Sequence, residues 1–208
     1  MANTAEQNLI VAEMAVDHVR QKMTKGASNK PIDLVHAQMR HKQGLKTRLG
    51  ILGGIAAALT SPDLTEKSVT QQRRTAPSRP ATMSIRDRIL ADALRVEGTG
   101  IGNCGEQTAV GFRYLAVHKK FSDPFCYVNL HRNHACLVLG ARRSDVHGTF
   151  ALASPPPWPA GAVICDPWFN EWFRVDLDWT RKVRSILAVT EPGPPPDRIV
   201  VGVVAEFP

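Results

Sequence analysis

Apolar positions in the first 25 residues recur at helical spacing, with charged side chains between them. They are Leu9, Ala12, Val16, Val19 and Met23. A period of 3.6 residues places these side chains on one face, so we expect an amphipathic helix over residues 5–25. The segment GASNKP (26–31) ends it, and residues 32–41 are predicted to form a second helix.

A further helical pattern begins at Ser84, in SIRDRILADALRV (84–96). Ser84 is a favourable N-cap, and Asp87 three residues later is the acidic partner that such a cap often has. A glycine-rich loop follows in GTGIGNCGEQTAV (98–110). This loop is predicted to lead into a helix that starts at Cys104 and ends near Val117.

After residue 120 the pattern changes to short runs rich in β-branched and aromatic residues, separated by turn sequences. The runs are 125–130, 134–141, 162–166, 172–177, 186–189 and 199–207. In the second run, alternation puts His134 and Cys136 on one face and Ala135 and Leu137 on the other. Helices followed by several strands predict an α+β fold with an antiparallel sheet.

Composition and charge divide the chain near residue 82. Residues 61–82 are rich in Ser, Thr, Pro, Gln and Arg, which is typical of a linker. Residues 1–90 carry 14 Lys and Arg against 7 Asp and Glu, whereas residues 91–208 carry 12 of each. We therefore predict a basic, mostly helical leader with its linker (1–82) and a second domain (83–208).

Positive charge in the leader attracts nucleic acid, acidic lipid or an acidic protein. Because no aromatic interleaving or nucleic-acid motif accompanies it, we do not expect nucleic acid to be the partner. The run KTRLGILGGIAAAL (46–59) is shorter than the roughly 17 to 25 residues that span a bilayer. A buried helix is the expected role of this run, and membrane contact by the leader is the alternative. The start at Met1 does not resemble a signal peptide, although Met39 would open one if it were the true start.

Four cysteines, at 104, 126, 136 and 165, are not arranged in CxxC pairs. This spacing argues against zinc-ribbon and thioredoxin-like sites, and the count is too low for a disulfide scaffold. Reduced thiols are therefore expected. Cys104 stands out because free N–H groups and the positive dipole end at the start of a helix favour a thiolate.

Two later segments supply partners for a reactive thiol. His134 opens a strand, so it is the expected base, with His131 as the alternative; Asp166 ends AVICD directly before Pro167 and would orient the imidazole. His131, His134 and Cys136 also suggest a zinc site, but alternation places the two histidines on opposite faces. We expect no metal and no cofactor.

The segments GNCGEQTA, NHACLVLG and ICDPW, in this order, resemble the papain-like/transglutaminase-like superfamily of Cys-His-Asp enzymes. They are most similar to bacterial effector and toxin domains, which include cysteine proteases and glutamine deamidases. The resemblance covers about residues 98–180. It implies a catalytic helix packed on an antiparallel sheet, with Cys104 as nucleophile, His134 as general base and acid, and Asp166 as the orienting carboxylate. It also implies a protein substrate in a host or target cell and a secreted or translocated protein, a cytoplasmic one being the alternative.

One departure concerns the oxyanion hole. Papain-type proteases carry a glutamine shortly before the cysteine, and VEGTGIGN (96–103) has none. We expect the backbone N–H of Cys104, with help from Asn103, to take that role. Gln107 is predicted to face the substrate, and Trp168 to line the groove or shield the His–Asp pair from water.

The sequence thus predicts a cysteine-dependent enzyme that transfers the acyl group of a protein amide. Peptidase, glutamine or asparagine deamidase and transglutaminase activities all fit, because the acyl acceptor decides among them. The alternative is a non-enzymatic binding module whose basic leader engages nucleic acid, lipid or an acidic protein.

Overall fold

The computed structural model of the protein describes residues 3–24, 71, 73, 80–119, 121–191 and 193–208. The helices are α1 (Ala5–Lys22), α4 (Ile85–Thr99), α5 (Cys104–Arg113), α6 (Arg143–Val146) and α7 (Val175–Thr190), with a π-helix, η1 (Tyr114–Lys119), after α5. The strands are β1 (Phe125–Leu130), β2 (His134–Leu139), β3 (Gly148–Ala151), β4 (Val163–Asp166), β5 (Glu171–Arg174) and β6 (Arg198–Phe207). The predicted helix at 32–41 and the apolar run at 46–59 lie outside the described residues.

The strands form one six-stranded sheet in the order β3-β6-β1-β2-β4-β5. Each neighbouring pair is antiparallel. This confirms the predicted α+β class with an antiparallel sheet. β1 and β2 form a hairpin in which Leu130 lies opposite His134, and β4 pairs with β2 on its other side, with Leu137 opposite Cys165.

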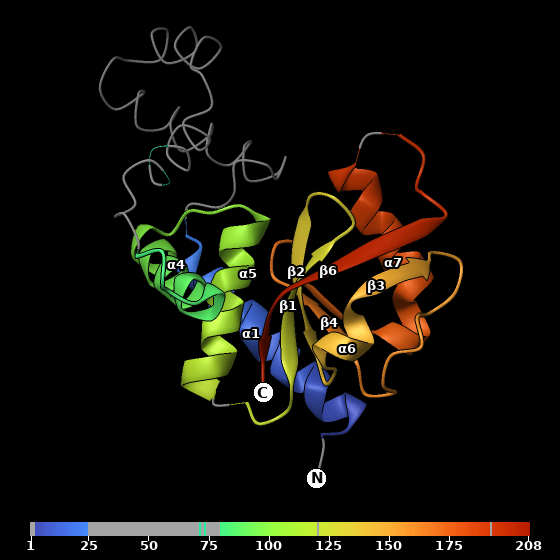
Figure 1. Ribbon diagram of the computed structural model, residues 1–208, viewed down its shortest axis with the longest axis horizontal. Helices are drawn as coiled ribbons and strands as arrows, with labels where there is room; N and C mark the ends of the chain where they lie inside the picture. Colours follow the sequence, from blue (N-terminus) through green and yellow to red (C-terminus); the bar gives the residue numbers. More distant parts are fainter. Residues whose placement is uncertain (1–2, 25–70, 72, 74–79, 120, 192) are drawn as a thin grey trace, which may run out of the picture.

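Helices cover both faces of the sheet (Figure 1). α1, α4 and α5 pack on one face, where Leu137 and Leu139 of β2 join their apolar core. α7 packs on the other face, where Cys136 and Val138 of the same strand are buried. The alternation predicted for β2 is confirmed.

α1 is an integral part of the fold. Ala12 and Val16 are fully buried in the same core as α4, α5 and the sheet. Asn8 Nδ2 donates a hydrogen bond to the Gly161 carbonyl oxygen (2.9 Å), and the Cys165 thiol donates to the Ala12 carbonyl (3.5 Å). The predicted boundary at residue 82 therefore needs correction for α1, which folds with the domain rather than with a separate leader.

The predicted helices over 84–96 and from Cys104 are present, and Ser84 Oγ accepts from the Asp87 N–H (3.1 Å) as expected. The prediction failed at 186–189, which lies in α7, and at 172–177, where the strand ends at Arg174. The buried residues of this helix are Val175, Trp179, Val183, Ile186 and Leu187. They share one helical face, so packing against the sheet favours a helix there. Among the described residues, no helix combines the length and apolarity needed to cross a membrane.

Candidate active site

Cys104 is the first residue of α5, and the sheet holds this end of the helix in place. Thr108, one turn later, donates from Oγ1 to the Ala135 carbonyl oxygen of β2 (2.9 Å). Tyr127 of β1 donates from its hydroxyl to the Gly105 carbonyl (3.1 Å). Since both bonds reach the first turns of α5, they fix the thiol over the beginning of β2.

His134 and Asp166, the two predicted partners, lie side by side. His134 is the first residue of β2 and Asp166 the last of β4, and these strands are neighbours. His134 Nε2 lies 2.5 Å from Asp166 Oδ2, and the two side chains are 1% and 0% exposed. Asp166 Oδ1 accepts from the Phe169 N–H (3.1 Å). Both carboxylate oxygens are thus engaged, which fixes the imidazole.

The remaining ring nitrogen of His134 is available to the thiol. Nδ1 is buried and makes no hydrogen bond of regular geometry to any described residue. Burial alone would raise the pKa of Cys104, but hydrogen bonding and charge attraction from His134 outweigh it, and the pKa is lowered. Burial would likewise lower the pKa of His134, whereas the charge and hydrogen bond of Asp166 raise it to about 10. These opposite shifts favour a thiolate–imidazolium pair.

The other three cysteines differ from Cys104 in exposure and in pKa. Cys126, Cys136 and Cys165 are buried, whereas Cys104 is partly exposed. Burial raises the pKa of each buried thiol, that of Cys126 to about 12. Thiolate chemistry near neutral pH is therefore expected at Cys104 among the four.

Among the described residues, His131, the alternative base, has no comparable carboxylate partner. It lies in the turn between β1 and β2 with a positive φ of 55°, and its buried Nδ1 has no hydrogen-bond partner in that part of the chain. Since Asp166 is engaged by His134, the geometry favours His134 as the base.

Trp168 lies over the His134–Asp166 pair. Its side chain is 2% exposed, and its ring centroid is 5.6 Å from that of His134. Phe169 meets the same imidazole edge-on at 5.6 Å. The burial of Trp168 favours the predicted shielding of the pair from water over a place in an open groove.

Gln107 and Asn103 belong to the junction between the glycine loop and α5. Gln107 is 5% exposed and donates from Nε2 to the Gly102 carbonyl (3.0 Å), so it braces the loop and does not face a substrate as predicted. Asn103 is the N-cap of α5, and its N–H donates to Glu106 Oε2 (3.1 Å). Its contribution to an oxyanion hole stays a prediction.

Glu106 and Arg73 form a contact that the sequence interpretation missed. Arg73 donates from Nε to Oε1 of Glu106 (2.7 Å) and from Nη2 to Oε2 (2.9 Å). Arg73 belongs to the linker-like stretch, where nothing in the local pattern distinguishes one arginine from its neighbours. The position of Glu106, two residues after the predicted nucleophile, was the one feature of the sequence that could have indicated a role near the site.

Metal-ligating side chains meet elsewhere in the described part of the chain. Potential ligand atoms of His18, Glu97 and His118 lie within 4.8 Å of one another, whereas His131, His134 and Cys136 form no such group there. Arg113 Nη1 lies 3.0 Å from both oxygens of Glu97 and 2.8 Å from His118 Nε2. A guanidinium thus already supplies the positive charge in this cluster.

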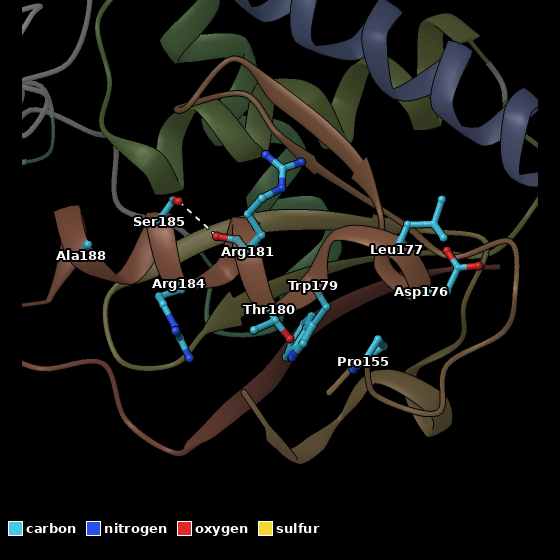
Figure 2. A pocket seen from close by; sticks show the side chains of 9 residues that line it. All are labelled: Pro155, Asp176, Leu177, Trp179, Thr180, Arg181, Arg184, Ser185 and Ala188. Atoms are coloured by element: carbon cyan, nitrogen blue, oxygen red, sulfur yellow. Dashed lines mark hydrogen bonds between the residues drawn. The ribbon is translucent and has the colours of Figure 1, made fainter. Parts of the chain in front are cut away.

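An open groove of about 800 Å³ runs along the outer side of α7 (Figure 2). Apart from Pro155, its lining residues all belong to α7. They are Pro155, Asp176, Leu177, Trp179, Thr180, Arg181, Arg184, Ser185 and Ala188. None of the candidate catalytic residues lines it, so this groove is not the active site.

Comparison of the chain with protein-family models, with characterised proteins and with solved structures gave no match. The side chains of the site are therefore the guide to its activity. A half-buried thiol of lowered pKa, beside an imidazole fixed by a buried carboxylate, is suited to nucleophilic attack and proton transfer.

Proposed function

We propose that the protein is a cysteine-dependent acyl-transfer enzyme that acts on protein amides, with Cys104, His134 and Asp166 as its catalytic groups. The observation that carries this proposal is the buried His134–Asp166 pair (2.5 Å), which leaves only Nδ1 of the imidazole for the thiol. A merely structural histidine has no need for a fully buried carboxylate beside a partly exposed thiol.

The chemistry follows from the two protonation states. The Cys104 thiolate attacks the amide carbonyl carbon, and a C–S bond forms. His134 gives its Nδ1 proton to the leaving nitrogen as the C–N bond breaks, which yields a thioester and an amine or ammonia. Water or a second amine then attacks the thioester and returns a proton to His134. General acid–base help of this kind contributes roughly 100- to 10,000-fold.

The negative oxygen formed during attack needs donors. The first N–H groups of a helix have no partner within the helix, and Cys104 is the first residue of α5. Its own backbone N–H is the proposed oxyanion donor, which is consistent with the missing glutamine before the cysteine.

The broader assignment rests on the arrangement of the elements. A helix that begins with the nucleophile packs on an antiparallel sheet whose neighbouring strands carry the base and the carboxylate, as in papain-like/transglutaminase-like enzymes. With the sequence resemblance, this supports a bacterial effector or toxin that is secreted or translocated and acts on a protein in a target cell. Peptidase and deamidase are the favoured activities.

Intact mass spectrometry of candidate protein substrates tests the proposal. Wild-type protein should produce cleavage products, a gain of about one dalton from deamidation, or a crosslinked species, and each outcome names a different acyl acceptor. Cys104→Ala should abolish the product, while Cys126→Ala, which removes a buried thiol, serves as the matched control. Equal product with Cys104→Ala would exclude the proposed nucleophile.

A further inference from the structure

The carboxylate nearest in sequence to Cys104 already holds a guanidinium. Glu106 accepts from Nε and Nη2 of Arg73 at 2.7 and 2.9 Å. This two-pronged geometry matches a carboxylate to the planar fork of arginine, and a lysine ammonium cannot reproduce it. The contact is therefore specific for the type of cation it binds.

The receptor side of this contact is preformed, whereas Arg73 reaches it from elsewhere in the chain. Glu106 is only 10% exposed, and its Oε2 also accepts from the Asn103 N–H (3.1 Å), which holds the carboxylate in place. The Arg73 side chain is 56% exposed. The carboxylate is thus oriented by its own helix start, whereas the Arg73 side chain is largely in solvent, so the contact is not a core ion pair.

The site adjoins the reactive thiol. Glu106 lies in the first turn of α5, two residues after Cys104. The hydrogen bonds to Glu106 raise the pKa of Arg73, and the charges of Glu106 and Cys104 add to this effect. An arginine bound by Glu106 therefore lies at the same end of α5 as the nucleophile.

We propose that Glu106 is an arginine-recognition subsite, occupied in this structure by Arg73 of the same chain, and that the substrate presents an arginine close to the amide that Cys104 attacks. The inference rests on the proposed function for its reactive thiol. Arg73 acts as a competitor within the same chain, because it occupies both carboxylate oxygens that a substrate arginine would use.

Two alkylating peptides that differ in one side chain test the subsite. Both carry a chloromethyl ketone, whose carbon forms a bond to the Cys104 sulfur as chloride leaves, and they have arginine or the uncharged norleucine at the same position. The ratio of their alkylation rates, measured on the full chain by mass spectrometry, cancels changes in the reactivity of the thiol itself.

Arg73→Ala should raise the arginine-to-norleucine ratio about tenfold, because the subsite becomes free. Glu106→Gln added to Arg73→Ala should remove that gain while keeping an acceptor for the Asn103 N–H. Arg132→Ala, which removes an exposed arginine from the turn before His134, is the matched control and should leave the ratio unchanged.

An unchanged ratio in Arg73→Ala, with efficient labelling of Cys104 by both reagents, would overturn the subsite and leave the proposed function standing. So would a fall in both rates at constant ratio, since Arg73 would then act only as a supporting charge. Failure of both reagents to label wild-type Cys104 would overturn the proposed function and the subsite together.

Discussion

The helices on the two faces of the sheet are attached to it in different ways. On the α1, α4 and α5 face, buried or part-buried hydrogen bonds fix individual points, such as Thr108 to the Ala135 carbonyl and Tyr127 to the Gly105 carbonyl. On the α7 face the contacts are mainly apolar, through side chains such as Trp179, Val183 and Leu187, although Trp179 Nε1 also donates to the Ala151 carbonyl (3.0 Å).

The two kinds of attachment suit the different roles of the two faces. Apolar packing stabilises without strict direction, whereas a hydrogen bond loses strength with small changes in distance and angle. The helix that positions Cys104 is the one pinned by directional bonds. His134 and Asp166 lie at the ends of their strands and, by alternation, project toward the α7 side, so the site forms where the two faces meet. The polar bonds are thus expected to control reactivity and the apolar layer to control stability.

The largest expected effect comes from removing the group at this meeting point. In wild-type protein, limiting iodoacetamide near neutral pH should label Cys104 well before the three buried cysteines. His134→Ala removes the imidazolium that lowers the Cys104 pKa, so the thiolate fraction near neutrality falls. Labelling should slow at least tenfold and recover only well above about pH 9, because without His134 the burial of Cys104 raises its pKa above that of an ordinary thiol. Turnover should fall roughly 100- to 10,000-fold.

His118→Ala is the control for the histidine substitution, because His118 lies in η1 at the far end of the α5 segment. In this variant, the rate of Cys104 labelling and its dependence on pH should match those of the wild-type protein. If Cys126 were modified as fast as Cys104 in the folded wild-type protein, the binding-module alternative would be favoured over the enzyme.

A second experiment breaks the apolar layer alone. Trp179 of α7 is fully buried in the core between this helix and the sheet, and Trp179→Ala should lower the free energy of unfolding by about 3 to 5 kcal/mol. Urea titration measures this loss. Labelling is then measured without urea and at low temperature, where the variant stays folded. The rate of Cys104 labelling should be unchanged, because the hydrogen bond and ring contact of Trp179 join it to Ala151 and Trp158 and not to α5.

The smallest expected change in stability comes from one of the polar bonds. Thr108→Val keeps the shape of a fully buried side chain but removes the hydroxyl that donates to the Ala135 carbonyl, at a cost of about 1 kcal/mol. Despite this small cost, the start of α5 loses a directional bond, and labelling of Cys104 should slow by a few fold. If Trp179→Ala slowed labelling more than Thr108→Val, the contrast between the faces would be wrong.

Sequence reasoning located the parts of the site that depend on local signals. The N-cap of α4, the helix start at Cys104 and the strands that begin at His134 and end at Asp166 all follow from short patterns. The adjacency of the last two does not follow from a pattern, because it requires β2 and β4 to pair across a 23-residue connection. The order of the three motifs suggested that pairing only through the family resemblance.

The errors share a physical cause, which is that packing decides where local preference is ambiguous. The run ILAV (186–189) suits a strand or a buried helix equally well, and the α7 face selects the helix. The amphipathic pattern of α1 predicts an apolar face but does not say what packs against it. The linker-like composition of residues 61–82 therefore led to the wrong prediction that this helix belongs to a separate leader. Gln107 was predicted to face the substrate, but its side-chain amide donates to the Gly102 carbonyl inside the fold.

The docking of α1 has a consequence for biosynthesis. Asn8 bonds to the carbonyl of Gly161, 153 positions later, and β6 takes its place between β3 and β1 only after residues 198–207 have been made. At about 5 to 20 residues per second, the ribosome takes roughly 8 to 30 s to add the residues between Asn8 and Gly161. Until then α1 lacks β4 and β5, two of the elements on which it packs, so part of its apolar face stays uncovered while the chain is being made.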